Sequence, residues 1–457
     1  MKKLLLFALV FTMSIYFFLE LGTNNDLALK LYGQQKIKWC WAASTQMVIN
    51  YQKGYINDTL VQCEIVNKAS NSTGCCDNLC TEDTACSEGM FVNDYLSHTF
   101  EPNGYTADST YGFNRFNWGQ ITEQIDANLP FLVTEIHQNT SDDSRRKLWS
   151  NHAIVGYGYV ETSSEKWIMF KDPWEMCKGC AYAITLNTLE KGGHNIGFTE
   201  FAIDPEDGYA AYPPVIFYNF RPINHEVPIP ERVFSFLNTN MRATSRSLKK
   251  QFREFEHYEI NSAKKIAQLS LNSFKSSASN KVLKALNLEN LPSLKIDQLS
   301  DSLIKKVISV KSLKDNPTSL EKVFIQSNHS RKVVVYLVIN GSRLSSVTLT
   351  QIDGSDFWRI DAISNCAWLP IAERIAKDEQ LSKIDDFKSE KFKEIGQISL
   401  QNSYYQFYEL QYGNERYYLP RKDYRNSVYN KFYTESDFLY LTRQLLIPND
   451  ILYHGPH

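Results

Sequence analysis

Cysteines constrain this chain more than any other residue type. Eight of its 9 cysteines lie between Cys40 and Cys180, and only Cys366 lies beyond them. Disulfides form and persist in oxidising compartments. An odd number of cysteines gathered in one region predicts disulfides together with one thiol kept for another purpose. The sequence therefore predicts a cross-linked N-terminal half in which one cysteine is set apart.

The N-terminus predicts the same kind of compartment. Lys2 and Lys3 precede an apolar run, residues 4–19, which only Thr12 and Ser14 interrupt. A charged segment followed by an apolar one is typical of an export signal. Because the run is about as long as the shortest membrane span, we predict that residues 1–23 are a signal peptide or a signal anchor. The rest of the chain is then secreted, periplasmic or at the cell surface.

Length and charge bound the domain organisation and the partners. The chain has 457 residues, which is enough for two domains. Its 49 Lys and Arg residues balance 51 Asp and Glu residues, so it offers no basic surface for nucleic acid. Three prolines within 222–230 disfavour helix and predict an extended linker there. We therefore predict one domain at 28–222 and another at 231–457; the oligomeric state stays open.

The pattern of apolar residues predicts an α+β first domain. Good helix formers over residues 39–51, followed by Gly54, predict one helix. Runs rich in β-branched and aromatic residues predict strands at 131–137, 152–160, 166–171 and 215–220. We expect the helix to pack on an antiparallel sheet formed by these strands.

The second domain is predicted to be α+β as well, with β-hairpins. Helical patterning lies within residues 245–271. Asn-Gly and Asp-Gly pairs between alternating apolar runs are strong hairpin cues. Such turns occur at 340–341 and 353–354, and a third hairpin is predicted to turn at 413–414. No residue pattern in this region points to chemistry.

Cys40 is the candidate nucleophile. It begins the predicted helix, and the positive end of a helix macrodipole favours the thiolate, which is the nucleophilic form. Gln34 lies six residues upstream, with Gln35 as the neighbouring alternative. The side-chain amide of Gln34 and the backbone N–H of Cys40 would form two donors for an oxyanion. The alternative role of Cys40 is half of a disulfide.

His152 is the candidate base. It begins a predicted strand, and two antiparallel strands at 152–160 and 166–172 would bring Asp172 back beside it. A carboxylate in that position holds the tautomer of the imidazole and stabilises the imidazolium. Trp174, two residues later, would shield the contact from water and so strengthen it. His137 is the alternative base.

These motifs, taken in order along the chain, resemble the papain-like cysteine peptidases. They are Gln34, the stretch Trp39-Cys40-Trp41-Ala42-Ala43, the strand-borne His152, and Asp172-Pro173-Trp174. The resemblance is to the branch of bacterial and bacteriocin-processing peptidases that have Asp-Pro in place of papain's Asn. It covers about residues 30–180. Lys38 and Trp39 stand where papain has Gly-Ser, which changes the cleft on that side.

The resemblance implies a role for each residue of the site. Cys40 would be the nucleophile, His152 the general base and acid, Asp172 the residue that orients His152, Gln34 the oxyanion donor, and Trp41 and Trp174 substrate contacts. It implies a papain-like α+β fold, no cofactor, and no metal.

The other clustered cysteines resemble the disulfide region of that family. Residues 62–64 and the stretch from Cys75 to Cys80 carry this likeness. Sequence alone does not fix which cysteines pair. A zinc site at Cys75, Cys80, Cys177 and Cys180 is the alternative, which export disfavours.

The expected function is that of an exported cysteine peptidase. It would hydrolyse peptide bonds of a peptide or protein substrate through a thioester acyl-enzyme, and it would meet a membrane only through an N-terminal anchor. Two alternatives stay open. One is a different cysteine-dependent acyl transfer, such as amide hydrolysis of small substrates or transamidation. The other is an inactive binding protein that acts through residues 231–457.

Overall fold

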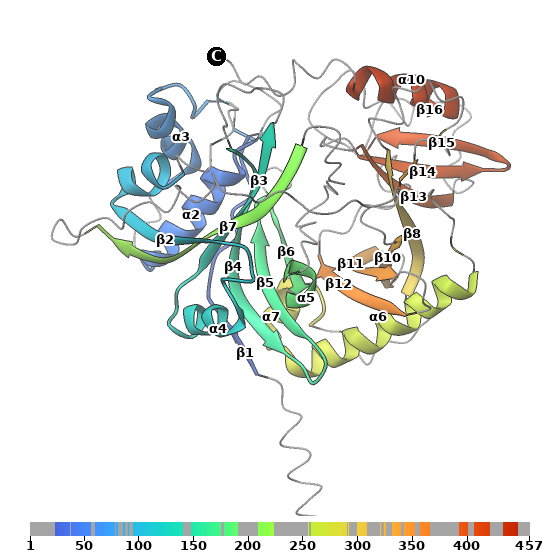
Figure 1. Cartoon of the computed structure of the whole chain (residues 1–457), viewed down its shortest axis with the longest axis horizontal. Coiled ribbons are helices and arrows are strands. Elements are labelled where there is room, and N and C mark those ends of the chain that lie inside the picture. Colours follow the sequence, from blue (N-terminus) through green and yellow to red (C-terminus); the bar gives the residue numbers. More distant parts are fainter. Residues whose placement is uncertain are drawn as a thin grey trace, which may run out of the picture.

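Strands dominate the chain and join into one continuous sheet (Figure 1). The computed structural model describes residues 23–36, 38–55, 60–77, 79, 80, 86, 90, 95–139, 148–174, 178–190, 209–223, 255, 257–289, 291, 299–308, 320, 324–325, 331–339, 342–351, 357–365, 393–400, 406–420 and 433–446. Residues 1–22 of the predicted export segment and most of the predicted linker lie outside these residues. None of the helices that it describes is long and apolar enough to cross a membrane.

The first half contains the predicted nucleophile helix and all four predicted strands. Its helices are α2 (Cys40–Gln52), α3 (Gln62–Ser70), a π-helix (Leu96–Phe100), a 3-10 helix (Glu101–Asn103), α4 (Trp118–Asp126) and α5 (Leu186–Glu190). Its strands are β1 (Asn24–Asp26), β2 (Tyr105–Tyr111), β3 (Phe131–Asn139), β4 (Leu148–Glu161), β5 (Lys166–Asp172), β6 (Cys180–Thr185) and β7 (Tyr209–Pro222).

The second half is rich in hairpins, as predicted. Its helices are α6 (His257–Ser277), α7 (Asn280–Ala285) and α10 (Glu435–Leu446). Its strands are β8 (Leu299–Ile308), β9 (Phe324–Ile325), β10 (Arg331–Ile339), β11 (Ser342–Gln351), β12 (Trp358–Ser364), β13 (Lys393–Leu400), β14 (Gln406–Tyr412), β15 (Glu415–Pro420) and β16 (Tyr433–Thr434). Gly413 turns the last predicted hairpin with a φ of 59°, which suits a glycine. The predicted turns at 340–341 and 353–354 lie outside the described residues.

The helix α2 packs on the antiparallel sheet, which confirms the predicted α+β class. In the first half the strand order is β6-β5-β4-β3-β7-β2, and α2 lies against β4. Residues 40–50 of α2 are all buried. A helix that is enclosed on all sides is held by packing rather than by propensity, so its first turn has a fixed position.

A strand pairing joins the two halves of the chain edge to edge. β12 pairs antiparallel with β6, with Ile363 opposite Ala183. The ring of Phe274 on α6 also meets Trp167 on β5, with centroids 5.2 Å apart. The sheet therefore runs through both predicted domains, and the boundary placed at 222–231 stays a prediction.

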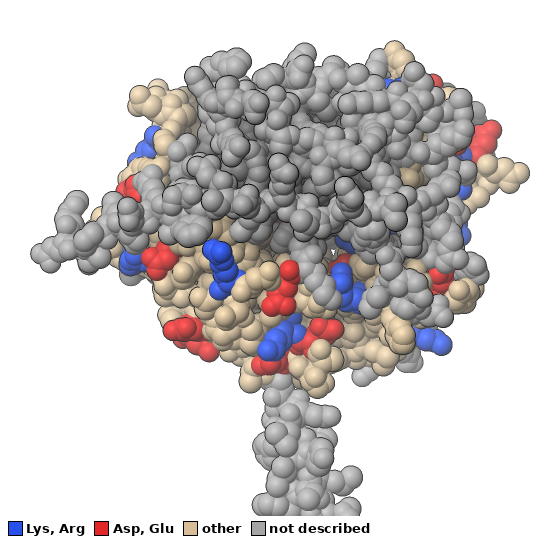
Figure 2. Space-filling view, viewed as in Figure 1, with Lys and Arg blue, Asp and Glu red and all other residues tan. Residues whose placement is uncertain are grey.

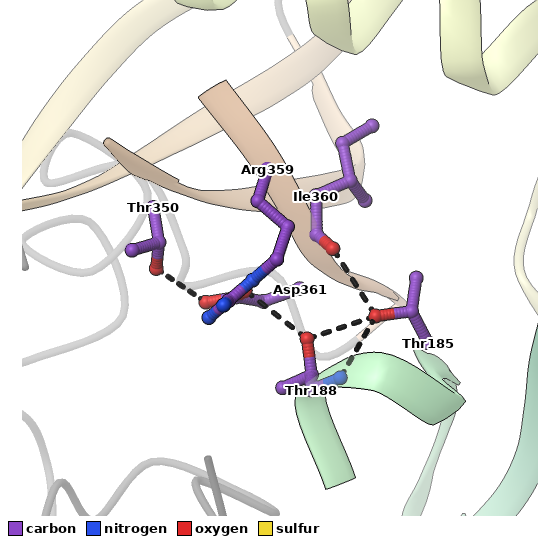
Figure 3. A network of polar contacts seen from close by, with 6 residues as sticks. All are labelled: Thr185, Thr188, Thr350, Arg359, Ile360 and Asp361. Carbon is purple, nitrogen blue, oxygen red and sulfur yellow. Dashed lines mark hydrogen bonds and ion pairs between the residues drawn. The ribbon is translucent and has the colours of Figure 1, made fainter. Parts of the chain in front are cut away.

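A buried polar network closes this junction (Figure 3). The Asp361 carboxylate on β12 accepts hydrogen bonds from Thr350 Oγ1 at 2.5 Å, Thr188 Oγ1 at 3.1 Å and Arg359 Nε at 3.0 Å. Thr185 donates to the carbonyl of Ile360 at 3.2 Å. The network thus links β6 and α5 of the first half to β11 and β12 of the second.

Replacing Asp361 with Ala is expected to lower the free energy of unfolding by roughly 2–3 kcal/mol, because buried donors lose their acceptor. Urea unfolding of the full chain measures this change. Glu161→Ala is the matched control, because its ion pair with Lys166 is exposed and such pairs contribute about 0.5 kcal/mol or less. Equal effects of the two substitutions would show that the junction is not a main source of stability.

Charged side chains are mixed on the face shown in Figure 2. Among the residues described there, acidic and basic side chains are interspersed and do not gather by sign. Exposed charges of both signs in this arrangement keep local fields small.

Candidate active site

Cys40 begins α2 and is the free cysteine among the described residues. No side chain caps the helix at Trp39, and no acidic residue lies in its first turn. The first N–H groups of the helix therefore keep their positive partial charge for an anion at this end. The alternative role of Cys40 as half of a disulfide is wrong in this structure.

Trp39 holds the backbone segment that leads into α2. Its side chain is fully buried, and its indole Nε1–H donates to the carbonyl of Cys86 at 2.7 Å. Lys38, just before it, has a φ of 68°, in the left-handed region that a side chain rarely adopts. This is the position at which papain has glycine. Lys38 therefore adopts the sharp turn in this chain, and the buried indole of Trp39 holds the residue that follows it.

His152 and Asp172 lie together, as the sequence predicted. β4 pairs antiparallel with β5, with Val155 opposite Lys171, so the strand ends that carry the two residues are neighbours. His152 Nε2 and Asp172 Oδ1 are 2.8 Å apart, and both side chains are buried. A β-bulge precedes His152, because Ser150 and His152 face consecutive residues of β3. Such a bulge re-aims the side chain that follows it.

Trp174 completes the surroundings of this pair. Its backbone N–H donates to the same Oδ1 of Asp172 at 2.7 Å. Its ring meets the His152 ring edge to face, with centroids 5.6 Å apart. One oxygen of the carboxylate is therefore held by two groups, and the Trp174 ring packs against the imidazole.

The protonation of His152 depends on both neighbours. Burial lowers the pKa of His152, but the charge and hydrogen bond of Asp172 raise it, and so does its interaction with Cys40. The result is a pKa well above the ordinary 6.5, which favours the imidazolium at neutral pH. Nε2 is used by Asp172, while Nδ1 makes no hydrogen bond to any residue that the structure describes. Nδ1 is thus the nitrogen left for Cys40.

Ser44 ties the nucleophile helix to the histidine strand. Its hydroxyl donates to the carbonyl of Ala153 at 2.9 Å, and both residues are fully buried. Ser44 lies one helical turn after Cys40, and Ala153 follows His152. This hydrogen bond therefore helps to fix the helix that carries the sulfur against the strand that carries the imidazole. Ser44 was not predicted from the sequence, because its only cue is a hydroxyl on an otherwise apolar helix face.

Tyr95 is a second residue that the sequence analysis missed. Its side chain is fully buried, and its hydroxyl donates to the carbonyl of Trp41 at 2.8 Å. The contact holds the first turn of α2. Nothing in the local sequence around Tyr95 predicts it, because its partner lies 54 residues earlier.

Gln34 lies against the turn that follows Asp172. Its backbone N–H donates to the carbonyl of Pro173 at 2.8 Å, and its side chain is 1% exposed. The side-chain Oε1 has no hydrogen-bond partner among the described residues. Gly179 permits this packing, because a Cβ there would lie 2.9 Å from the carbonyl oxygen of Asp172. The loop of Gln34 and the turn of Asp172 are therefore held together.

The two tryptophans predicted to contact substrate differ in exposure. Trp41 is only 3% exposed, so its side chain mainly fills the core. Trp174 is half-buried and covers His152. Both substrate contacts stay predictions. The side chain of His137, the alternative base, lies outside the described residues.

Disulfides surround the loop that leads to Cys40. Cys63 pairs with Cys76, and Cys75 pairs with Cys86. Cys80 and Cys180 are disulfide-bonded as well, and the N–H of Cys80 donates to the carbonyl of Gln35 at 2.8 Å. The zinc alternative is wrong, because three of its four proposed ligands are oxidised. Cys177 and Cys366 lie outside the described residues.

The comparison with known families agrees with this arrangement. Residues 26–195 match the Peptidase_C39 like family, a range that includes Gln34, Cys40, His152 and Asp172. The match confirms that this part of the chain is similar to the papain-like cysteine peptidases, and it is consistent with the bacteriocin-processing branch. The match supports a cysteine-peptidase type of function for this region. No curated protein matches the chain.

Proposed function

We propose that the chain is an exported cysteine peptidase that hydrolyses peptide bonds through an acyl-enzyme on Cys40. One observation carries the proposal: a buried free cysteine begins the helix that Ser44 joins to the strand of His152, and the buried Asp172 lies 2.8 Å from that histidine. Nucleophile, base and orienting carboxylate are the parts that this chemistry needs.

The residues suit a two-step reaction. The Cys40 thiol gives its proton to His152 Nδ1, and the thiolate attacks the peptide carbonyl to form a C–S bond. The Gln34 amide and the Cys40 backbone N–H stabilise the oxyanion. His152 returns the proton to the leaving nitrogen as the C–N bond breaks. Water, deprotonated by His152, then attacks the thioester, which releases the carboxylic acid and restores Cys40.

Asp172 suits this cycle through charge and position together. Its carboxylate accepts from Nε2, so Nδ1 is the nitrogen that is left to take the proton of Cys40. It also raises the pKa of His152, so that the proton taken from Cys40 is held until the amine leaves. The Trp174 N–H keeps the carboxylate in place while the histidine changes charge.

Export is supported by the disulfides, because cross-links of this kind persist in oxidising compartments. A peptide or protein is the substrate class that this proposal implies.

Covalent labelling tests the proposal. A peptidyl chloromethyl ketone is expected to alkylate Cys40 of the full chain at neutral pH, as located by mass spectrometry. An ordinary thiol of pKa 8.5 is only about 3% ionised at pH 7. If His152 holds the thiolate, His152→Ala should slow labelling by roughly tenfold or more. Equal labelling of parent and variant would contradict the proposed pair.

Product analysis separates hydrolysis from the other acyl transfers. Mass spectrometry of a peptide substrate incubated with a free amine is expected to show carboxylic acid products. Amide products that contain the added amine would instead identify a transamidase, because the amine would have replaced water at the thioester.

A further inference from the structure

Gln62 contacts the backbone on both sides of Gln34. Gln62 begins α3 and is 1% exposed. Its Oε1 accepts from the backbone N–H of Gln35 at 2.8 Å. Its Nε2 donates to the carbonyl of Gly33 at 2.9 Å. One buried amide therefore holds the residues directly before and after the proposed oxyanion donor.

The amide of Gln62 is itself fixed to the nucleophile helix. Nε2 donates a second hydrogen bond to Gln46 Oε1 on α2, at 3.1 Å. Gln46 in turn donates from Nε2 to the carbonyl of Leu60 at 3.0 Å. Both N–H groups of Gln62 thus meet oxygens and its oxygen meets an N–H, so only one orientation of the amide satisfies all three contacts.

The neighbouring covalent structure holds Gln62 in place. The disulfide Cys63–Cys76 begins one residue later. Segment 33–35 also receives a hydrogen bond from the Cys80 N–H and gives one to the Pro173 carbonyl. The Gln62 amide links this segment to the helix that begins at Cys40.

We propose that Gln62 is a positioning residue that sets the place of the Gln34 side chain relative to Cys40 through the Gly33 and Gln35 backbone. This inference rests on the proposed function. Oxyanion donors must lie about 3 Å from the developing charge, and a displacement of about 1 Å costs roughly 100-fold in rate. Gln62 touches no reacting atom, so its effect passes through Gln34.

The test compares Gln62→Leu with a matched control, Gln124→Leu. Gln124 is a buried glutamine on α4 whose amide also makes two hydrogen bonds to one residue, Asn219 on β7. In the full chain, Gln62→Leu is expected to lower kcat for a peptide substrate by roughly 10- to 100-fold, with KM changed less than about twofold. Gln124→Leu should keep the parent kcat.

Three further measurements separate positioning from loss of structure. Alkylation of Cys40 by iodoacetamide needs no oxyanion donor, so Gln62→Leu should leave its rate within about twofold. Amide hydrogen exchange should rise at Gln35, whose N–H loses its acceptor, and not in β4. If Gln62 acts through Gln34, the variant Gln34→Ala with Gln62→Leu should be no slower than Gln34→Ala alone. Gln62→Met, which is similar in length and also lacks the acceptor, serves if the leucine variant does not fold.

Failure of this inference differs from failure of the proposed function. An active parent with unchanged kcat in Gln62→Leu, additive losses in the double variant, or unchanged exchange at Gln35 would each overturn the role of Gln62. Equal hydrolysis by the parent and Cys40→Ala would overturn the proposed function itself. The exchange experiment still tests the contact in that case, because it needs no activity.

Discussion

Replacing Cys40 with Ala is expected to reduce peptide hydrolysis by the full chain to background, a loss of roughly 10⁴-fold or more. The physical reason is that no other group in the site can form the thioester. The fold should survive, because Cys40 is not cross-linked and the change removes a single buried atom. A stability loss of about 1 kcal/mol is the expected scale. Hydrolysis rates and urea unfolding measured on the same preparations check both parts.

The matched control for Cys40→Ala is Met47→Leu. Met47 lies on the same helix and is fully buried, and its replacement conserves volume. It should keep most of the activity. Cys40→Ser retains the shape of the site with a far weaker nucleophile, and it should match the alanine variant. Parent-level turnover by either Cys40 variant would remove Cys40 from the mechanism.

Replacing Asp172 with Ala is expected to lower kcat/KM by roughly 10²- to 10³-fold, because the imidazole loses the charge and the hydrogen bond that hold it. Asp172→Asn separates the two effects. The amide still offers an oxygen to His152 and to the Trp174 N–H, but its charge is gone. Its loss of rate should therefore be smaller than that of the alanine variant.

The pH profile carries the sharper part of this prediction. Asp172 helps to raise the pKa of His152, and the proposed ion pair needs the imidazolium. Activity should therefore persist above pH 6.5, as long as the pH stays below the raised pKa of His152. It should fall when the pH rises through that pKa. In Asp172→Asn this limb should move to lower pH. The raised pKa of His152 also contributes to the free energy of unfolding. This contribution is fully present below about pH 6.5, the pKa of histidine in the unfolded chain, and is lost as the pH rises through the folded-state pKa.

Asp108→Asn is the control for the pH experiment. Its carboxylate lies on β2, where it pairs with Arg221 at 2.9 Å with both side chains partly exposed. The substitution removes one negative charge from the first half without touching His152. An equal movement of the alkaline limb in both variants would show that Asp172 acts only through net charge.

The local part of the site could be predicted from the sequence. The cue for the α2 helix is a run of good helix formers that ends near Gly54, and the cue for β4 and β5 is two β-rich runs separated by a short connection. Because two such strands pair as neighbours, His152 and Asp172 had to return to one another. Each of these inferences depends only on residues within a few tens of positions of one another. The pattern of apolar and β-branched residues along the sequence is enough to predict them.

The supporting contacts could not be predicted. Ser44 donates to a carbonyl 109 residues away, and Gln62 accepts from an N–H 27 residues away. A serine or glutamine has no pattern that names its partner, since any nearby backbone group can satisfy it. The choice of Cys75 with Cys86 rather than with adjacent cysteines has the same cause.

The sequence by itself determined the α+β class, the meeting of His152 with Asp172, and the oxidised character of the cysteine-rich region. Only the tertiary structure decided that Cys40 stays free, that Gln62 bonds to Gly33 and Ser44 to Ala153, and that β12 extends the first-half sheet at β6. The reason is that helix and strand patterns follow from neighbours along the chain. Hydrogen bonds, disulfides and edge pairings between distant segments depend on which groups folding leaves side by side.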